Sequence, residues 1–108
     1  MNHSSNLSHI KRSQKESLLL RELSKMLLQL SLDDAELNGL FINRVELSPK
    51  RSACYVFFYT NEGETFYREN LGKLILFKPS LRAALAKEMN NRYTPEIIFK
   101  YDKSEEKD

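Results

Sequence analysis

The chain has 108 residues, of which 41% are hydrophobic and 30% are charged, and its formal net charge is +2. This length suits one domain with a single modest core and leaves no room for a deep substrate cleft as well. No stretch approaches the roughly 20 apolar residues of a membrane-spanning helix, and the polar residues 1–7 do not resemble a secretory signal. The single cysteine, Cys54, excludes an internal disulfide. We therefore expect a monomer in a reducing cytoplasm, without a membrane partner.

The first predicted element is a helix. Residues 1–10 are polar and rich in serine, and we expect them to be flexible. From Lys11 to about Asp33 apolar residues recur at steps of three and four, which predicts an amphipathic helix. The stripe consists of Leu19, Leu23, Met26, Leu27 and Leu30. Ser13 and Glu16 have the spacing of a capping box, which would place the helix start at Ser13.

Two strands follow. Residues 40–47 predict a strand with Phe41, Val45 and Leu47 on one face, although Asn43 interrupts that apolar face. Residues 48–50 (SPK) predict a turn. Residues 53–60 (ACYVFFYT) predict a second strand, and the short connection favours an antiparallel hairpin.

The second strand has two different faces. Cys54, Val56 and Phe58 alternate with Tyr55, Phe57 and Tyr59. We expect the first set to face the core, with Cys54 as a small core residue rather than a nucleophile. The three aromatic residues then lie on the open face of the sheet. They either stack unpaired bases or pack across the strands against Ile42 and Ile98, and we favour packing.

The remaining pattern is helical and then extended. A helical period resumes after Gly63 and runs to about Phe77, and Pro79 predicts a kink or break. A further stripe runs from Leu81 to Met89, and residues 96–102 predict a strand with Ile97, Phe99 and Tyr101 on one face. The order α-β-β-α-(kink)-α-β predicts an α+β fold, a three-stranded sheet covered by helices on one face.

The sequence contains no recognisable catalytic or metal-binding pattern. His3 and His9 lie in the polar N-terminal segment without partners at metal-ligand spacing. No glycine-rich phosphate loop or nucleophile motif occurs. We therefore expect no enzymatic activity, no metal, no cofactor and no small-molecule substrate.

Charge is segregated along the chain. Residues 1–32 carry five basic and two acidic residues, residues 73–92 carry five basic residues and one acidic residue, and residues 33–47 have an acidic excess. Such segregation fits a one-sided footprint for a polyanion. Ordinary solvated helix faces explain the charge pattern at least as well.

Three motifs in order resemble the ribosome-binding factor A family. They are residues 44–49 (RVELSP) with 54–58 (CYVFF), Leu81-Arg82 with Leu85 and residues 92–102 (RYTPEIIFKYD), and Arg21-Glu22-Leu23 with Leu27 in the first helix. The resemblance extends from about Lys11 to Lys103. It implies a type II KH-like domain over residues 11–103, between a flexible N-terminal segment (1–10) and a charged tail (104–108).

The resemblance also implies a function. Family members bind 16S ribosomal RNA in the immature 30S subunit and assist its late maturation around the 5′ end and neck region, most importantly in the cold. The chain departs from the family pattern in having Lys78-Pro79 at the helix kink, Lys50-Arg51 after the Ser-Pro turn, and Gln14 where the family has arginine. A protein–protein adaptor that uses the aromatic sheet face is the alternative function.

The candidate RNA-binding residues are basic and lie mainly around the kinked helices. The first set is Lys73, Lys78, Arg82, Lys87 and Arg92, and the second is Lys50, Arg51, Lys11, Arg12 and Lys15. Lys78 and Arg82 are four residues apart and should share a helix face. Arg82 and Arg92 match family arginines, although Arg92 is equally suited to a structural role beside Glu96.

Overall fold

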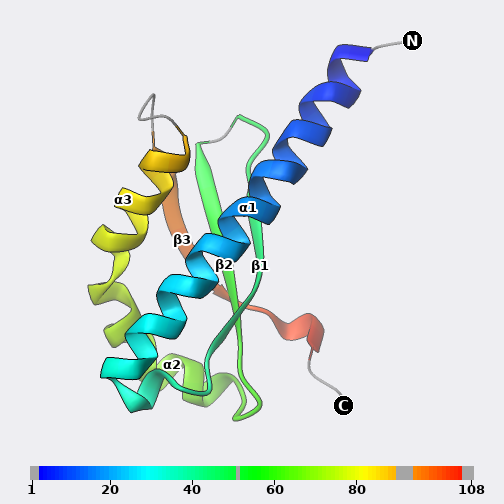
Figure 1. The fold of residues 1–108 in the computed structure, drawn as a ribbon. Coiled ribbons are helices and arrows are strands. Elements are labelled where there is room, and N and C mark those ends of the chain that lie inside the picture. The colour runs from blue at the N-terminus through cyan, green and yellow to red at the C-terminus, as the bar shows by residue number, and fades with distance from the viewer. Residues whose placement is uncertain (1–2, 51, 90–93, 106–108) are drawn as a thin grey trace.

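The computed structural model describes the backbone of residues 3–50, 52–89 and 94–105, and the side chains of residues 10–50, 52–89 and 94–104. In chain order the elements are α1 (His3–Asp33), η1 (Ala35–Leu37), β1 (Phe41–Leu47), β2 (Ala53–Tyr59), α2 (Glu64–Leu76), α3 (Lys78–Glu88), β3 (Glu96–Tyr101) and η2 (Lys103–Glu105). The predicted α-β-β-α-α-β order and α+β class are confirmed (Figure 1).

The sheet has the strand order β1-β2-β3. β1 is antiparallel to β2, as the hairpin prediction required, and β3 is parallel to β2. Val45 of β1 and Phe99 of β3 both pair with Val56 of the central strand. The helix α1 crosses the sheet diagonally, and the shorter helices α2 and α3 lie beside it (Figure 1). This arrangement leaves the opposite face of the sheet open.

The core lies between the helices and the inner face of the sheet. Leu19 and Leu23 of α1 and Leu85 of α3 are at most 1% exposed. From β2, Val56 and Phe58 are equally buried, which confirms the predicted alternation of this strand. The helical stripe predicted for α1 is confirmed as its buried face.

Cys54 is part of this core and is completely buried. Burial, with a smaller contribution from the nearby charge of Glu16, raises the pKa of the Cys54 thiol to about 12. The thiol therefore stays protonated at neutral pH, and the prediction that Cys54 is a packing residue is confirmed.

The predicted start of the first helix is wrong. Because α1 begins at His3, Ser13 lies inside the helix and cannot cap it. Glu16 instead accepts a hydrogen bond from the backbone N–H of Leu47 at 2.7 Å. This amide does not face β2, since the neighbouring Ser48 amide is the one that donates to Ala53 of that strand. The flexibility expected of residues 1–10 stays a prediction.

The predicted inward face of β1 is wrong at its beginning. Phe41 is 56% exposed, whereas Ile42, Val45 and Leu47 are buried. The register with β2 shifts between Ile42 and Arg44, so Asn43 is the additional residue of a β-bulge. One inserted residue reverses the alternation, which brings Ile42 and Val45 to the same face.

The side chain of Asn43 takes part in a polar junction at the end of β3. Asp102 is 2% exposed and accepts hydrogen bonds from Asn43 Nδ2 at 2.7 Å and from Ser104 Oγ at 2.6 Å. Arg44 Nε lies 3.5 Å from the same carboxylate. Burial alone would raise the pKa of Asp102, but the hydrogen bonds from Ser104 and Asn43 and the charge of Arg44 outweigh it and lower the pKa.

Candidate nucleic-acid interface

Two consecutive helices meet at one residue, Phe77. It ends α2 and begins α3, with φ −93° and ψ −1°, so the helical hydrogen-bond pattern is interrupted there. Pro79 lies in the first turn of α3, where its missing N–H is not needed and its fixed φ suits the helix. The predicted break next to Pro79 is confirmed.

Lys78 and Arg82 come together beside this break. They line a shallow groove between α3 and β3 together with Pro79, Glu96 and Ile97. Lys78 Nζ lies 4.9 Å from the ring centroid of Phe99, a residue of β3 that packs against the core. Arg82 is exposed. The groove thus offers two cations, an apolar floor and one carboxylate at its rim.

Lys73 does not join this groove. Its ammonium lies 2.8 Å from a carboxylate oxygen of Glu36 and 3.2 Å from one of Asp34. The hydrogen bond to Glu36 is the main reason why the pKa of Lys73 is raised. The charge of Lys73 is therefore already matched by two carboxylates, and its visible role is to connect α2 to the segment after α1.

Lys87 is exposed but does not lie on the same side of α3 as Lys78. It follows Lys78 by nine positions, and at about 100° per residue this places it on the opposite side of α3. Lys50 is exposed at the turn between β1 and β2. The predicted Arg51 and Arg92 lie outside the described residues.

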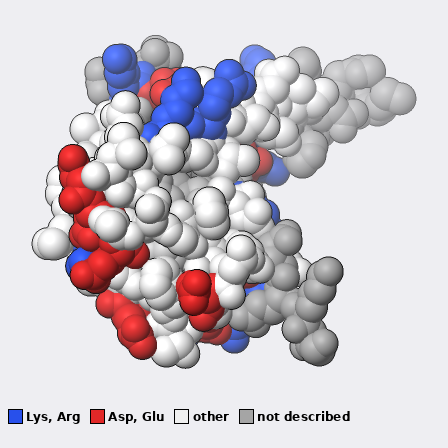
Figure 2. Space-filling view, turned by 60° about the horizontal axis from the view of Figure 1, so that its bottom comes forward, with Lys and Arg blue, Asp and Glu red and all other residues white. Residues whose placement is uncertain are grey.

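The basic residues of α1 lie beside the end of α3. Lys15 Nζ donates to the backbone carbonyl of Glu88 at 2.8 Å, which fits the preference for a cation at a helix C-terminus. Lys11 is exposed and lines a shallow depression with Lys15, while Arg12 is partly buried. Basic side chains gather along the upper edge of the face in Figure 2, and acidic side chains lie along its left and lower parts. The charge segregation seen in the sequence is thus also present in space.

The open face of the sheet carries two cations that the sequence did not mark as candidate site residues. Arg44 lies 4.0 Å above the ring centroid of Phe57, and Lys100 Nζ lies 5.9 Å from that of Tyr55. Tyr55 also pairs with Ile98 in the sheet register, as the packing interpretation expected. Ile42 does not take part because it is buried on the other side. Strand alternation, once corrected for the bulge, is the signal that places both cations on this face.

In the part of the chain that the structure describes, no helix is long and apolar enough to cross a membrane.

Comparison with known proteins identifies a family. A sequence model of the family described as ribosome-binding factor A matches residues 11–108. The chain is 31% identical over 90 residues to ribosome-binding factor A of Prochlorococcus marinus strain MIT 9312, covering 82% of this chain and 69% of that protein. It is 34% identical over 86 residues to ribosome-binding factor A of Azoarcus sp. strain BH72, covering 80% and 68%.

A solved structure is also similar. The crystal structure of ribosome-binding factor A from Thermus thermophilus superposes with a TM-score of 0.65 at 27% identity, covering 82% of this chain and 92% of that one. The three helices and the three-stranded sheet agree with this structural match. The chain belongs to the ribosome-binding factor A family.

Proposed function

We propose that this protein is a ribosome assembly factor that binds 16S ribosomal RNA in the immature 30S subunit and assists its late maturation around the 5′ end and neck region. Membership of the ribosome-binding factor A family supports an assembly role. The observation that carries the RNA-binding part is the groove where Lys78 and Arg82 lie together beside the α2–α3 break. We further propose that the fold is a type II KH-like domain and that the protein catalyses no reaction.

The groove has the properties that an RNA backbone requires. Phosphates supply most of the affinity of such interfaces and are attracted by cations whatever the base sequence. The planar guanidinium of Arg82 can hold a phosphate with two hydrogen bonds, and Lys78 adds a second charge nearby. Glu96 at the rim repels phosphate, so we expect the RNA to approach from the side of Arg82 and not along β3.

Lys11 and Lys15 extend the proposed contact beyond the groove. The hydrogen bond from Lys15 to Glu88 holds the basic part of α1 against the end of α3. A backbone that follows α3 would therefore meet Lys78 and Arg82 first and the α1 cations next. Lys87 faces another direction and, with Lys50, belongs to a secondary set. Arg12, Arg51 and Arg92 remain proposed from the sequence, and Lys73 becomes the weakest candidate.

Co-sedimentation with purified 30S subunits tests this proposal. Arg82→Ala should weaken association about tenfold, which corresponds to about 1.4 kcal/mol. The matched control is Arg68→Ala, which removes an exposed arginine of α2 that pairs with Glu64. Both variants should keep the helical circular dichroism of the parent. Equal binding by the two variants would contradict the assignment of Arg82.

The adaptor alternative predicts that the unmodified chain stays in the supernatant. The cations over Phe57 and Tyr55 favour a packing role for the aromatic face, since each ring already has a partner within the fold. If the unmodified chain did not sediment with 30S subunits, the adaptor function would be preferred.

A further inference from the structure

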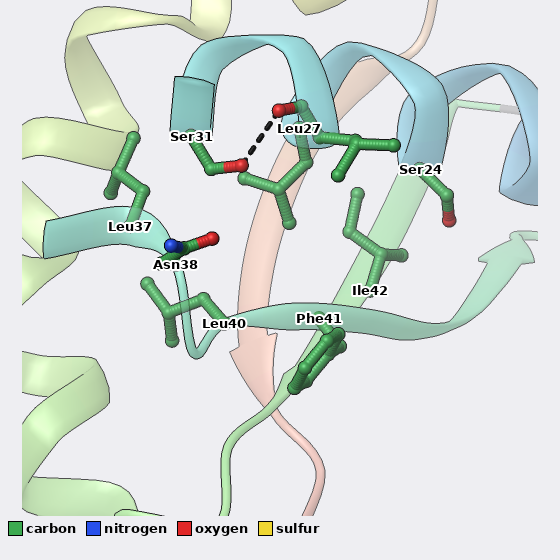
Figure 3. A pocket seen from close by; sticks show the side chains of 9 residues that line it. Ser24, Leu27, Ser31, Leu37, Asn38, Leu40, Phe41 and Ile42 are labelled. Atoms are coloured by element: carbon green, nitrogen blue, oxygen red, sulfur yellow. Dashed lines mark hydrogen bonds between the residues drawn. The ribbon is translucent and has the colours of Figure 1, made fainter. Parts of the chain in front are cut away.

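Two hollows of the surface differ in what they offer a ligand. The cavity between the end of α1 and the start of β1, about 180 Å³ in volume, is lined mainly by apolar side chains such as Leu27, Leu37 and Ile42 (Figure 3). The hydroxyl of Ser31 in this lining already donates to the backbone carbonyl of Leu28 at 2.6 Å. The groove between α3 and β3 has a volume of about 390 Å³ and carries charged side chains. The second hollow therefore has the groups with which a site can select its ligand.

The charges of the α3–β3 groove are divided between its two walls. Lys78 and Arg82 belong to α3, whereas Glu96 is the first residue of β3. Within the described part of the chain neither Arg82 nor Glu96 forms an ion pair, although both are exposed and line the same groove. A carboxylate beside two cations weakens the attraction of a phosphate, so phosphate binding alone gives Glu96 no role. The carboxylate is suited to a different group of the same ligand, one that donates hydrogen bonds.

The wall formed by β3 also has backbone groups that point into the groove. β3 is an edge strand of the described sheet, and the amide of Glu96 donates to the carbonyl of Ser52 on the β2 side at 3.1 Å. Because successive residues of a strand direct their backbone N–H and C=O groups to opposite sides, those of Ile97 point away from β2. Ile97 and Glu96 both line the groove. A backbone donor and an acceptor-only carboxylate are thus neighbours on one wall.

We infer that the α3–β3 groove binds an unpaired guanine of RNA and that Glu96 is the residue that selects it. The inference rests on the proposed RNA binding and adds a base preference to it. In this arrangement Arg82 and Lys78 hold the phosphate, and the attached base crosses the groove toward β3. The N–H of Ile97 donates to guanine O6, and the carboxylate of Glu96 accepts hydrogen bonds from N1–H and from the N2 amino group.

The order of hydrogen-bonding groups distinguishes guanine from the other bases. Along its Watson–Crick edge guanine presents an acceptor followed by two donors, which complements the N–H of Ile97 followed by the carboxylate of Glu96. Cytosine presents a donor followed by two acceptors, and uracil has an acceptor on each side of its donor, so both place an acceptor against the carboxylate. Adenine presents a donor followed by an acceptor. A base in a double helix has this edge occupied by its partner, so the guanine must be unpaired.

Short single-stranded RNAs test the base preference on the full chain. Fluorescence anisotropy measures the binding of a labelled uridine oligonucleotide with guanosine, inosine, adenosine or cytidine at its central position. Inosine is the sharpest comparison, because it lacks only the N2 amino group of guanosine. We expect the guanosine RNA to bind at least about fivefold more tightly than the inosine RNA, since inosine loses a hydrogen bond to a charged acceptor. The all-uridine RNA should bind as weakly as the inosine RNA or more weakly.

Three variants separate base selection from phosphate binding. Glu96→Gln should reduce the preference for guanosine over inosine to less than about twofold, because a neutral amide offers one acceptor oxygen in place of two charged ones. It should bind the all-uridine RNA at least as tightly as the parent, since a repelling charge is removed. Glu62→Gln is the matched control, which removes an exposed carboxylate beyond the opposite end of β2 and should keep the parental preference. Arg82→Ala should weaken every RNA by a similar factor and leave the preference unchanged.

Three results would overturn the inference. The first is equal binding of the guanosine and inosine RNAs by the parent. The second is a preference that survives in Glu96→Gln while every RNA binds more tightly, which would mean that Glu96 only repels phosphate. The third is no binding of any of these RNAs by a chain that sediments with 30S subunits. In each case, 30S association that still depends on Arg82 would leave the proposed function standing.

Discussion

The side-chain amide of Asn43 donates to Asp102 Oδ2 at 2.7 Å, and this bond connects the bulge of one edge strand to the end of the other. β2 lies between them, so the contact spans the width of the sheet. The Tyr101-Asp102 pair that helped to identify the family therefore has a visible structural function. Asp102 stabilises the register of β1 at the position where the alternation changes.

Asp102→Ala should lower the free energy of unfolding by about 1–3 kcal/mol, because a buried carboxylate loses its hydrogen bonds from Asn43 and Ser104 and its ion pair with Arg44. Urea denaturation followed by circular dichroism measures this change. Glu62→Ala is the control, since that side chain is exposed and its removal should change stability by less than about 0.5 kcal/mol. A loss of less than about 1 kcal/mol in Asp102→Ala would show that the junction is not important for stability.

The lowered pKa of Asp102 predicts that the free energy of unfolding falls at acidic pH. The pKa of Asp102 is lower in the folded state than its unfolded value of about 3.9. Its contribution is therefore complete above the unfolded pKa and is lost as pH falls through the folded pKa. Urea midpoints from pH 7 to pH 2 should show a shallower decline in Asp102→Ala than in the parent. Parallel curves would exclude Asp102 as a source of the acid sensitivity.

Lys78 and Lys73 should differ in their effect on salt-dependent RNA binding. About four phosphate contacts predict a log–log salt slope of about −3 to −4, and removal of one contact reduces its magnitude by about 1. We expect that reduction for Lys78→Met. Lys73→Met should keep the parental slope, because its ammonium already pairs with Asp34 and Glu36. Filter binding to a 16S RNA fragment at several salt concentrations measures the slopes, and the reverse order would contradict the assignment.

Cys54 should be protected from alkylation in the folded protein. With a pKa of about 12, only about one thiol in ten thousand is ionised at pH 8. Iodoacetamide at pH 8 should therefore label Cys54 slowly in buffer and rapidly in denaturing urea, as mass spectrometry would record. Rapid labelling of the folded chain would mean that the sheet opens around β2 on that time scale.

The sequence predicted the elements better than it predicted their ends and faces. The apolar stripe of α1 and the alternation of β2 depend on local periodicity, and the residues buried in the structure match these periodic positions. Elongation of an existing helix needs little apolar support, so α1 continues into the polar residues before Ser13. In β1, the only local sign of the bulge was that Asn43 interrupts the otherwise apolar face.

The candidate site depends on contacts between distant segments. Lys78 and Arg82 could be placed together from their spacing alone. The carboxylates that neutralise Lys73 belong to a distant segment, since Asp34 precedes it by 39 residues. No local sequence pattern predicts this contact. Alternation places Arg44 on the open face, but its position over Phe57 follows only from the pairing of β1 with β2.

The hydrogen bond from Leu47 to Glu16 has a further consequence for solubility. An edge strand with free outward amides is a template on which another chain can add a strand and begin aggregation. At Leu47 the carboxylate of Glu16 already accepts the hydrogen bond of that amide. Its negative charge would also repel the carbonyl oxygens of an incoming strand. Glu16 thereby protects the hairpin end of β1 against intermolecular strand pairing.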